Sequence, residues 1–280
     1  MKHDFYKYEA LGNDYIVIDP QQISLELTPQ RIQKICDRHF GVGSDGILYG
    51  PLFQDEKIQV RIFNPDGSEA EKSGNGIRIF SRFLWDQGYV QEKHFSLTTL
   101  GGDVAVTILD ELGENICVDM GTATFDSAAI PAAGARREML EQSICVHGKR
   151  FQVTCLSIGN PHCVIFDPAF TTETVNTWGP LLEQHDDFLE RTNVQFVRVL
   201  DRHNLEIEIW ERGAGYTLAS GSSSAAVAKA AFALGMVERN LTVHMPGGTL
   251  AVTVQQDGHI VITGPVHAIA TGSFCFSEMM

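Results

Sequence analysis

The chain has 280 residues, of which 44% are hydrophobic and 20% are charged, a composition typical of a folded globular protein rather than a disordered one. Its 21 Lys and Arg against 35 Asp and Glu give a formal net charge of −14, which argues against a nucleic-acid-binding protein or one that binds anionic membranes, because both need a basic face. No stretch approaches the roughly 20 apolar residues of a membrane span, and residues 1–7 contain no apolar signal core, so we expect a cytoplasmic protein.

Short runs rich in β-branched and aromatic residues predict a chain dominated by strands. In chain order, the predicted strands cover 14–19, 58–63, 95–99, 103–109, 151–157, 162–166, 194–200, 205–210, 241–245, 250–254 and 259–263. Apolar residues at helical spacing predict a helix over 75–87, which Gly88 ends, and a further helix is expected over 28–39. The segment 222–234 consists of small residues with one charge, which is typical of a buried helix.

The sequence also repeats itself at a period of about 147 residues. Leu11-Gly12-Asn13 is matched by Ile158-Gly159-Asn160, Ser73-Gly74 by Ser220-Gly221, Gly88 by Gly235, and 101–107 by 247–253. So long a period predicts two similar half-domains rather than a solenoid. We expect one at 1–120, completed by a C-terminal strand at about 267–280, and the other at 121–266, with 121–137 as the connection. Residues that coincide under the repeat are expected to meet across a cleft, a favoured place for a ligand.

Two polar loops lead into predicted helices through a Ser-Gly pair, over 64–76 and 211–224. The first backbone N–H groups of a helix are unpaired and lie at the positive end of its dipole, so they can hold a carboxylate or phosphate. Ser73 and Ser220 can equally be ordinary helix N-caps. The presence of two copies at equivalent positions favours an anion site over ordinary capping. The glycine after each serine would also let the backbone approach the anion.

Three further residues are candidates for a site. Glu211 and Arg212 follow a predicted strand beside Trp210 and a glycine-rich loop, which favours a partly buried carboxylate and a fixed cation over a surface ion pair. His162 follows Asn160-Pro161 and corresponds to Tyr15 under the repeat. This position favours a role in the site over a structural role.

No cofactor or metal site is predicted. Gly74-Asn75-Gly76 lacks the spacing of a dinucleotide-binding fingerprint. The six cysteines form no C-x-x-C pair and show no metal-ligand spacing, and we expect buried free thiols.

Taken together, these motifs resemble the diaminopimelate epimerase family. The resemblance spans nearly the whole chain and includes 11–15, 41–46, 64–78, 159–163 and 211–221. It implies an α+β fold of two pseudo-symmetric half-domains, each a curled β-sheet around a central helix. It also implies an isomerase of lysine biosynthesis that moves a proton at the α-carbon of an amino acid, converting LL- to meso-diaminopimelate without PLP or another cofactor. A homodimer is implied as well.

The resemblance also assigns the site residues. The family's two acid–base cysteines match Ser73 and Ser220, and the residues that partner those cysteines match His162 and Glu211. The distal amino-carboxylate group of a small zwitterionic substrate would be held by Asn13, Asn64, Asn160, Asn193, Glu211 and Arg212. The reacting α-carboxylate would be held by Gly74, Asn75, Gly221 and Ser222.

Serine at both acid–base positions is the main departure from the family. A thiol has a pKa near ~8.5, whereas a serine hydroxyl is far less acidic and needs a neighbouring base. Three interpretations remain open. The chain is a double Cys→Ser variant of an ordinary epimerase, or it is a natural epimerase, isomerase or dehydratase that relies on His162 and Glu211. The third interpretation is a catalytically silent homologue that binds an amino acid. Further differences from the family favour a natural branch; they lie at Lys72, Ile79, Tyr216 and Ser223.

Overall fold

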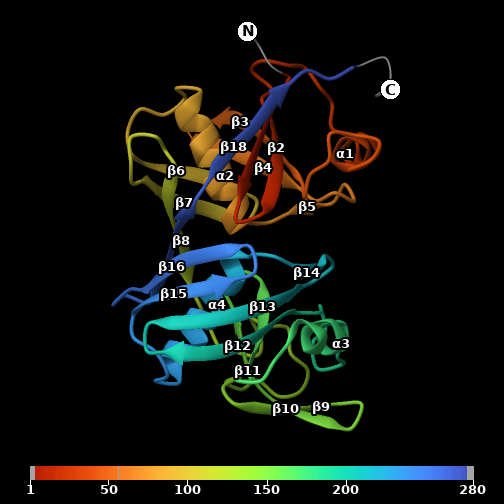
Figure 1. Cartoon of the computed structure of the whole chain (residues 1–280), viewed down its shortest axis with the longest axis vertical. Helices are drawn as coiled ribbons and strands as arrows, with labels where there is room; N and C mark the ends of the chain where they lie inside the picture. The colour runs from red at the N-terminus through yellow and green to blue at the C-terminus, as the bar shows by residue number, and fades with distance from the viewer. Residues whose placement is uncertain (1–3, 56, 276–280) are drawn as a thin grey trace. The chain divides into compact units, whose positions relative to one another are not determined.

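The computed structural model describes residues 4–55 and 57–275. The chain divides into two compact units. Figure 1 colours the chain by residue number, so that the segments of each unit can be traced in it. Unit 1 comprises 1–118 and 263–280, and unit 2 comprises 119–262. Among the described residues, each unit consists mainly of β-strands with two helices, which confirms the expected α+β class.

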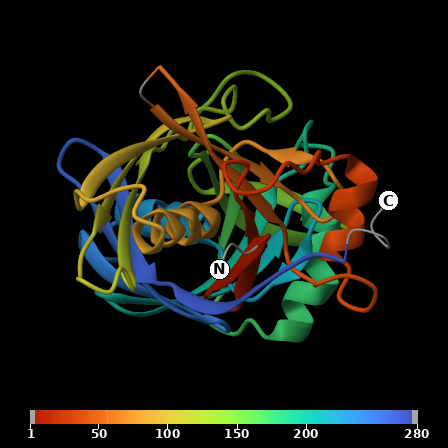
Figure 2. The same ribbon diagram turned by 90° about the horizontal axis from the view of Figure 1, so that it is seen from above.

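Unit 1 is built from strands that wrap around one central helix. Its elements are β1 (Phe5–Ala10), β2 (Asn13–Ile18), α1 (Pro29–Cys36), β3 (Ile47–Gln54), β4 (Lys57–Phe63), β5 (Glu69–Ala70), α2 (Gly74–Asp86), β6 (His94–Thr99), β7 (Gly102–Ile108), the start of β8 (Asn115–Thr122), and β18 (His267–Gly272). β1 pairs antiparallel with both β2 and β18. Parallel pairs join β2 to β3 and β4 to β6. Figure 2 shows α2 with strands of this unit on more than one side of it.

Unit 2 repeats this arrangement. Its elements are β9 (Gln142–Val146), β10 (Lys149–Ser157), β11 (Pro161–Phe166), α3 (Thr172–Glu183), β12 (Asn193–Asp201), β13 (Asn204–Glu211), β14 (Gly215–Thr217), α4 (Gly221–Ala233), β15 (Asn240–Met245), β16 (Gly248–Val254) and most of β17 (His259–Pro265). The parallel pairs β11–β12 and β13–β15 match β2–β3 and β4–β6 of unit 1. α2 and α4 have 13 residues each and begin at Gly74 and Gly221, the spacing of the sequence repeat.

All eleven predicted strands and the three predicted helices are present. α1 is shorter than the expected 28–39, because Thr28 is its N-cap and the helix ends at Cys36. The last turn of the prediction is instead a loop held by Asp37, whose carboxylate accepts hydrogen bonds from the backbone of the next residues. Of the expected C-terminal strand, β18 occupies His267–Gly272, and 276–280 lie outside the described residues.

α3 and several strands, among them β1 and β3, were not predicted from the sequence. α3 contains Gly179 and Pro180, which have poor helix propensity, and it is stabilised by a capping box between Thr171 and Thr174. β3 contains Gly50-Pro51, where its register with β4 shifts. Residues that break secondary structure therefore concealed α3 and β3.

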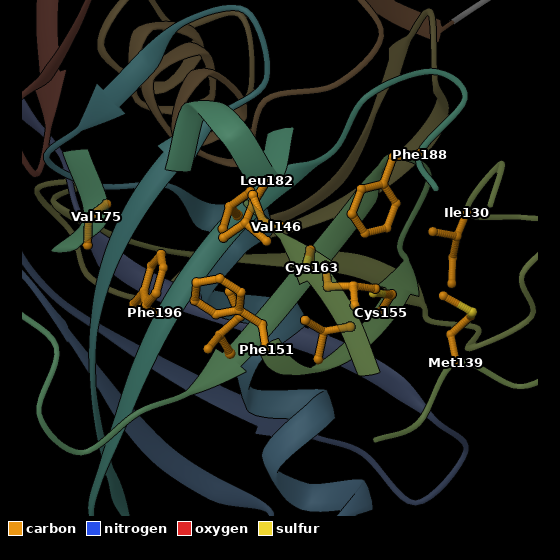
Figure 3. Packing of buried hydrophobic residues seen from close by; sticks show 14 of the residues in the cluster. Ile130, Met139, Val146, Phe151, Cys155, Cys163, Val175, Leu182, Phe188 and Phe196 are labelled. Atoms are coloured by element: carbon orange, nitrogen blue, oxygen red, sulfur yellow. The ribbon is translucent and has the colours of Figure 1, made fainter. Parts of the chain in front are cut away.

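The segment 121–137 is not a free connection between the units, because it folds onto unit 2. Thr124 bridges Ser157, and Ile130 is fully buried in the core of that unit. This core includes Phe151, Phe196 and the cross-strand pair Cys155 and Cys163, as Figure 3 shows. Within the described part of the chain, no helix is long and apolar enough to cross a membrane.

The expectation of buried thiols holds for half of the cysteines. Cys36, Cys155 and Cys163 are buried, whereas Cys145 and Cys275 are exposed and Cys117 is intermediate. The contact with Cys155, together with burial, raises the pKa of the Cys163 thiol well above its usual value. Cys163 is therefore a core residue in its neutral form, although it follows the candidate residue His162.

Candidate functional site

Ser73 stands at the start of α2, where it caps the helix. Its backbone is extended (φ −138°, ψ 116°), and its Oγ accepts a hydrogen bond from the Gly76 N–H at 3.0 Å. The Tyr15 hydroxyl, from β2, lies 3.3 Å from the same Oγ. Ser73 is only partly buried. The serine hydroxyl therefore contacts a phenol as well as the helix backbone.

Two candidate asparagines of unit 1 are joined in one hydrogen-bonded chain. Asn75 Nδ2 donates to Asn13 Oδ1 at 3.1 Å, and Asn13 Nδ2 donates to Asp45 Oδ2 at 3.0 Å. At the other end, Arg78 Nη2 donates to Asn75 Oδ1 at 3.0 Å. A carboxylate only accepts and a guanidinium only donates, so the two ends fix the orientation of both amides.

Arg78 is the fully buried end of this chain. Its Nη1 also lies 3.4 Å from the Gly74 carbonyl, so it bonds to the first turn of its own helix. Within the described residues, its Nε has no hydrogen-bond partner. Burial lowers the pKa of the guanidinium to about 10. A buried cation with amide and carbonyl partners holds the residues that follow Ser73 in one arrangement.

An ion-pair cluster supports the other end of the chain, at Asp45. Asp14 is buried and pairs with Lys7 and Arg38, each at 2.7 Å, and Arg38 also pairs with Asp45 at 2.6 Å. Burial alone would raise the pKa of the Asp14 carboxyl, but hydrogen bonds from Arg38 and Lys7 hold it below its ordinary value. Asp14 is therefore an ionised acceptor, and the arginine that it holds also fixes Asp45 beside Asn13.

Asn64 lies apart from this network, in a turn that closes on itself. Its Nδ2 donates to Ser68 Oγ at 3.0 Å, and Ser68 donates to Asp66. Gly67 takes φ +91° in this turn, a backbone conformation that glycine adopts without strain. From α1, Gln33 Nε2 donates to the Asp66 carbonyl at 2.8 Å.

In unit 2, Ser220 repeats the role of Ser73 at the start of α4. Its backbone is extended (φ −147°, ψ 125°), and its Oγ accepts from the Ser223 N–H at 3.4 Å. Its second contact is the Ser222 hydroxyl, at 3.3 Å. The equivalent cap therefore pairs with another serine rather than with a phenol.

His162 is fully buried in β11, and both of its ring nitrogens have partners. Gln195 Nε2 lies 3.1 Å from Nδ1, and Asn160 Oδ1 lies 3.0 Å from Nε2. Because Gln195 donates to Nδ1, the ring carries its proton on Nε2 and donates it to Asn160. Burial lowers the pKa of His162 to about 3. The imidazole is neutral, and Gln195 links it to Ser223 Oγ at 3.0 Å.

The loop that carries Glu211 and Arg212 is held by a buried carboxylate, Glu183 of α3. Glu183 Oε2 accepts from the Trp210 indole at 2.8 Å, and its Oε1 accepts from the Gly213 N–H at 3.0 Å. One carboxylate therefore accepts a hydrogen bond from the residue before Glu211-Arg212 and another from the residue after this pair. Glu183 was not predicted, since a glutamate within a missed helix carries no motif.

Asn193 fixes the same loop from β12. Its Oδ1 accepts from the Arg212 N–H at 3.0 Å, and its Nδ2 donates to the Pro161 carbonyl at 2.8 Å. Arg212 Nη1 lies 3.2 Å from the Glu190 carbonyl, and the Arg212 side chain is exposed. The positive group is therefore accessible, while its backbone is held in place.

The described contacts bring the predicted residues together in small groups. In unit 1, Asn13 bonds to Asn75, and both Asn75 and Gly74 accept from Arg78. In unit 2, Asn160 bonds to His162, and Asn193 accepts from the Arg212 N–H. Ser220 and Ser222 are in contact, and Gly221 begins α4 between them. Residues that sequence reasoning missed are Tyr15, Asp45, Arg78, Glu183 and Gln195. Only Tyr15 carried a signal, its equivalence to His162 under the repeat.

Comparison with known proteins identifies the family. The family model for diaminopimelate epimerase matches residues 5–125 and 154–269. The chain belongs to the diaminopimelate epimerase family. It is 52% identical over 269 residues to diaminopimelate epimerase 2 of Nostoc sp. strain PCC 7120, covering 96% of this chain and 94% of that protein. It is 38% identical to the diaminopimelate epimerase of Moorella thermoacetica, covering 96% and 98% of the two chains. The chain is therefore an isomerase of the amino-acid epimerase and racemase class.

More distant solved structures share the fold. A hydroxyproline epimerase from Agrobacterium vitis superposes with a TM-score of 0.70 at 12% identity, covering 95% of this chain and 90% of that one. A phenazine biosynthesis protein from Bacillus anthracis gives a TM-score of 0.67 at 16% identity, covering 96% and 97%. At such low identity the similarity concerns the fold alone, and it confirms the expected diaminopimelate epimerase-like architecture.

Proposed function

We propose that this member of the diaminopimelate epimerase family inverts the α-carbon of diaminopimelate, LL to meso, with serine in both acid–base positions. The observation that carries the proposal is the pair of serine-capped helices. Ser73 and Ser220 have the same backbone conformation and the same capping contact, and each is followed by a glycine at the first helical position. Inversion needs one proton-transfer group for each face of the α-carbon, and the repeat supplies two.

The helix starts would hold the reacting carboxylate. Gly74 and Asn75, and Gly221 and Ser222, provide backbone N–H groups at the positive ends of two helix dipoles. A negative charge that develops on the carboxylate when the α-proton leaves is stabilised by such donors. This stabilisation needs no cofactor.

The asparagines and Arg212 would hold the distal end of the substrate. Asn13 and Asn193 are fixed in orientation by their partners, and Arg212 has an exposed guanidinium on a fixed backbone. Arginine suits a bidentate contact with a carboxylate. Asn64, Asn160 and Glu211 are assigned to the same distal group by the family resemblance, and a zwitterionic amino acid matches this set of charges.

Serine is the weak element of the proposed mechanism, since a serine hydroxyl transfers a proton only with a partner. His162 is neutral and has both ring nitrogens occupied, so a role as base requires it to give up the bond from Gln195. Glu211 remains a proposed partner for a serine. We therefore expect slower turnover than a thiol pair would give, by about 10²- to 10⁴-fold, the usual contribution of general acid–base groups.

Proton NMR in D₂O tests the proposal. Purified protein is incubated with LL-diaminopimelate, and the α-proton signal and the stereoisomer formed are followed. The matched variant is the double substitution Ser73→Cys and Ser220→Cys. We expect loss of the α-proton signal with formation of the meso isomer in the native protein, and a faster reaction in the variant.

Three outcomes separate the alternatives. Binding of diaminopimelate by calorimetry without exchange in either protein would identify a binding homologue. A product other than a stereoisomer would identify a dehydratase or another isomerase. Exchange in the cysteine variant alone would show that the binding groups are intact and that the serines have silenced the site. Light scattering during size-exclusion chromatography tests the homodimer that belongs to this proposal.

A further inference from the structure

Ser73 has a neighbour that supplies what a serine acid–base group lacks. The Tyr15 hydroxyl lies 3.3 Å from Ser73 Oγ, and the Tyr15 side chain is buried. A phenol is far more acidic than an aliphatic hydroxyl, with an ordinary pKa near ~10, and tyrosine is an established general acid and base in enzymes. Ser73 also accepts from the Gly76 N–H, so its own proton is available for a bond to Tyr15 or to a substrate.

The surroundings of the pair leave room for both side chains. A Cβ atom on Gly46 would come within 2.7 Å of Tyr15 Cε1, so the ring occupies the space that a side chain at 46 would need. A Cβ atom on Gly76 would come within 3.2 Å of Ser73 Oγ. Gly46, just before β3, and Gly76, in α2, thus border the two partners, and their lack of a side chain leaves space for the contact.

We propose that Tyr15 is the proton partner of Ser73, so that a serine–tyrosine pair replaces the thiol at this position. The inference rests on the proposed function and deepens it. When the pair acts as an acid, the carbanion uses its electron pair to form the new C–H bond with the Ser73 hydroxyl proton. Tyr15 then returns a proton to Ser73 Oγ, and the negative charge ends on the Tyr15 oxygen. Run backwards, the same steps make the pair a base that takes up the α-proton.

The sharpest test is a double-mutant cycle between the two side chains. Tyr15→Phe removes only the hydroxyl and keeps the ring against Gly46. We expect Tyr15→Phe to slow exchange of the stereoisomer whose α-proton Ser73 transfers, by ~10²-fold or more. A thiol transfers protons without a relay, so in a Ser73→Cys background the loss caused by Tyr15→Phe should be at least tenfold smaller. A purely structural role for Tyr15 would give equal losses in both backgrounds.

Tyr8→Phe is the matched control. Tyr8 faces Tyr15 in the β1–β2 register, is also buried, and donates its hydroxyl to Asp86 at 3.0 Å, away from Ser73. Removing this hydroxyl should change exchange by less than ~3-fold in either background. Circular dichroism checks that all variants are folded.

The outcomes separate this inference from the proposed function. If Ser73→Ala abolishes exchange of the stereoisomer whose α-proton Ser73 transfers, while Tyr15→Phe does not slow that exchange, the inference is wrong and the proposed function stands. Equal losses in the native and the Ser73→Cys backgrounds also overturn the inference. If neither the native protein nor the double cysteine variant exchanges the α-proton, the proposed function fails and the inference fails with it.

Discussion

Tyr15 and His162 occupy equivalent positions in the two units, yet their side chains bond to different partners. Tyr15 reaches the capping serine of its own unit, at 3.3 Å from Ser73 Oγ. His162 bonds instead to Gln195 and Asn160, and Ser220 pairs with another serine. The duplication therefore preserved the backbone, while the groups around each serine diverged. The two serines should be chemically unequal although they are geometrically alike.

The loops that precede the two helices differ in the same way. In unit 1 the turn around Asn64 is closed by its own Ser68 and Asp66, with one exposed contact from Gln33 of α1. In unit 2 the loop after β13 is held by the buried Glu183 of α3. Helices at equivalent places in the fold thus support equivalent loops, but only one of them does so with a buried charge.

The largest expected effect separates the two serines. Ser73→Ala and Ser220→Ala should each reduce inversion of the α-carbon by ~10²- to 10⁴-fold, because each removes one acid–base group. Each variant keeps the group on one face and should still exchange the α-proton of one stereoisomer. Because the two serines serve opposite faces in the proposed mechanism, the two variants should retain exchange with opposite isomers, which proton NMR in D₂O detects.

Asparagine at the same positions provides the control for this experiment. Asparagine caps a helix about as well as serine does, but it has no hydroxyl. Ser73→Asn and Ser220→Asn should therefore keep the stability of the native protein and lose activity as the alanine variants do. Retained inversion in either asparagine variant would remove that serine from the mechanism.

The next effect concerns the loop supports. Glu183→Ala leaves the half-buried Trp210 indole without its acceptor, which costs about 1–3 kcal/mol, and it also removes the acceptor of the N–H of Gly213, an exposed residue. We expect the free energy of unfolding, measured with urea, to fall by about 1–3 kcal/mol. Gln33→Ala, which removes the exposed support of unit 1, should lower it by at most about 1 kcal/mol. Equal losses of stability in the two variants would mean that the buried carboxylate of Glu183 stabilises its loop no more than the exposed Gln33 does.

A pH dependence should follow from unit 2. The folded protein keeps His162 neutral because burial lowers its pKa to about 3, whereas the unfolded chain takes up a proton near the ordinary value of 6.5. The unfolded state therefore gains protons first as the pH falls. Below about pH 6.5, stability should decrease by about 1.4 kcal/mol per pH unit more than in a His162→Gln variant.

Urea titrations at about pH 7.5, 6.0 and 5.0 measure this difference. Above about pH 6.5 the folded and unfolded states both carry a neutral His162, so this contribution to the slope should vanish there. Parallel curves for the native protein and the His162→Gln variant at the two lower pH values would show that the buried imidazole takes up a proton in the folded state.

Much of the fold could be predicted from local pattern, because alternating strands and capped helices leave a periodic signal. The repeat also located Ser73 and Ser220, since a Ser-Gly pair before a helix is visible in the sequence. The contacts that support them were not predictable. Arg78 resembles any arginine on a helix, and the side chains of Glu183 and Gln195 bond to residues 27 to 33 positions away in the chain. Their roles depend on tertiary pairing, which one sequence without a structure does not specify.

The smallest expected effect is the difference in helix capping. Replacing a serine cap by alanine usually costs about 1 kcal/mol. The capping bond is 3.0 Å at Ser73 and 3.4 Å at Ser220, and a longer bond is weaker. Ser73→Ala should therefore lower the free energy of unfolding more than Ser220→Ala, as urea titration near neutral pH would measure. A larger loss at Ser220 would imply that its hydroxyl is held chiefly by Ser222, and that the cap of unit 2 depends on a pair of serines.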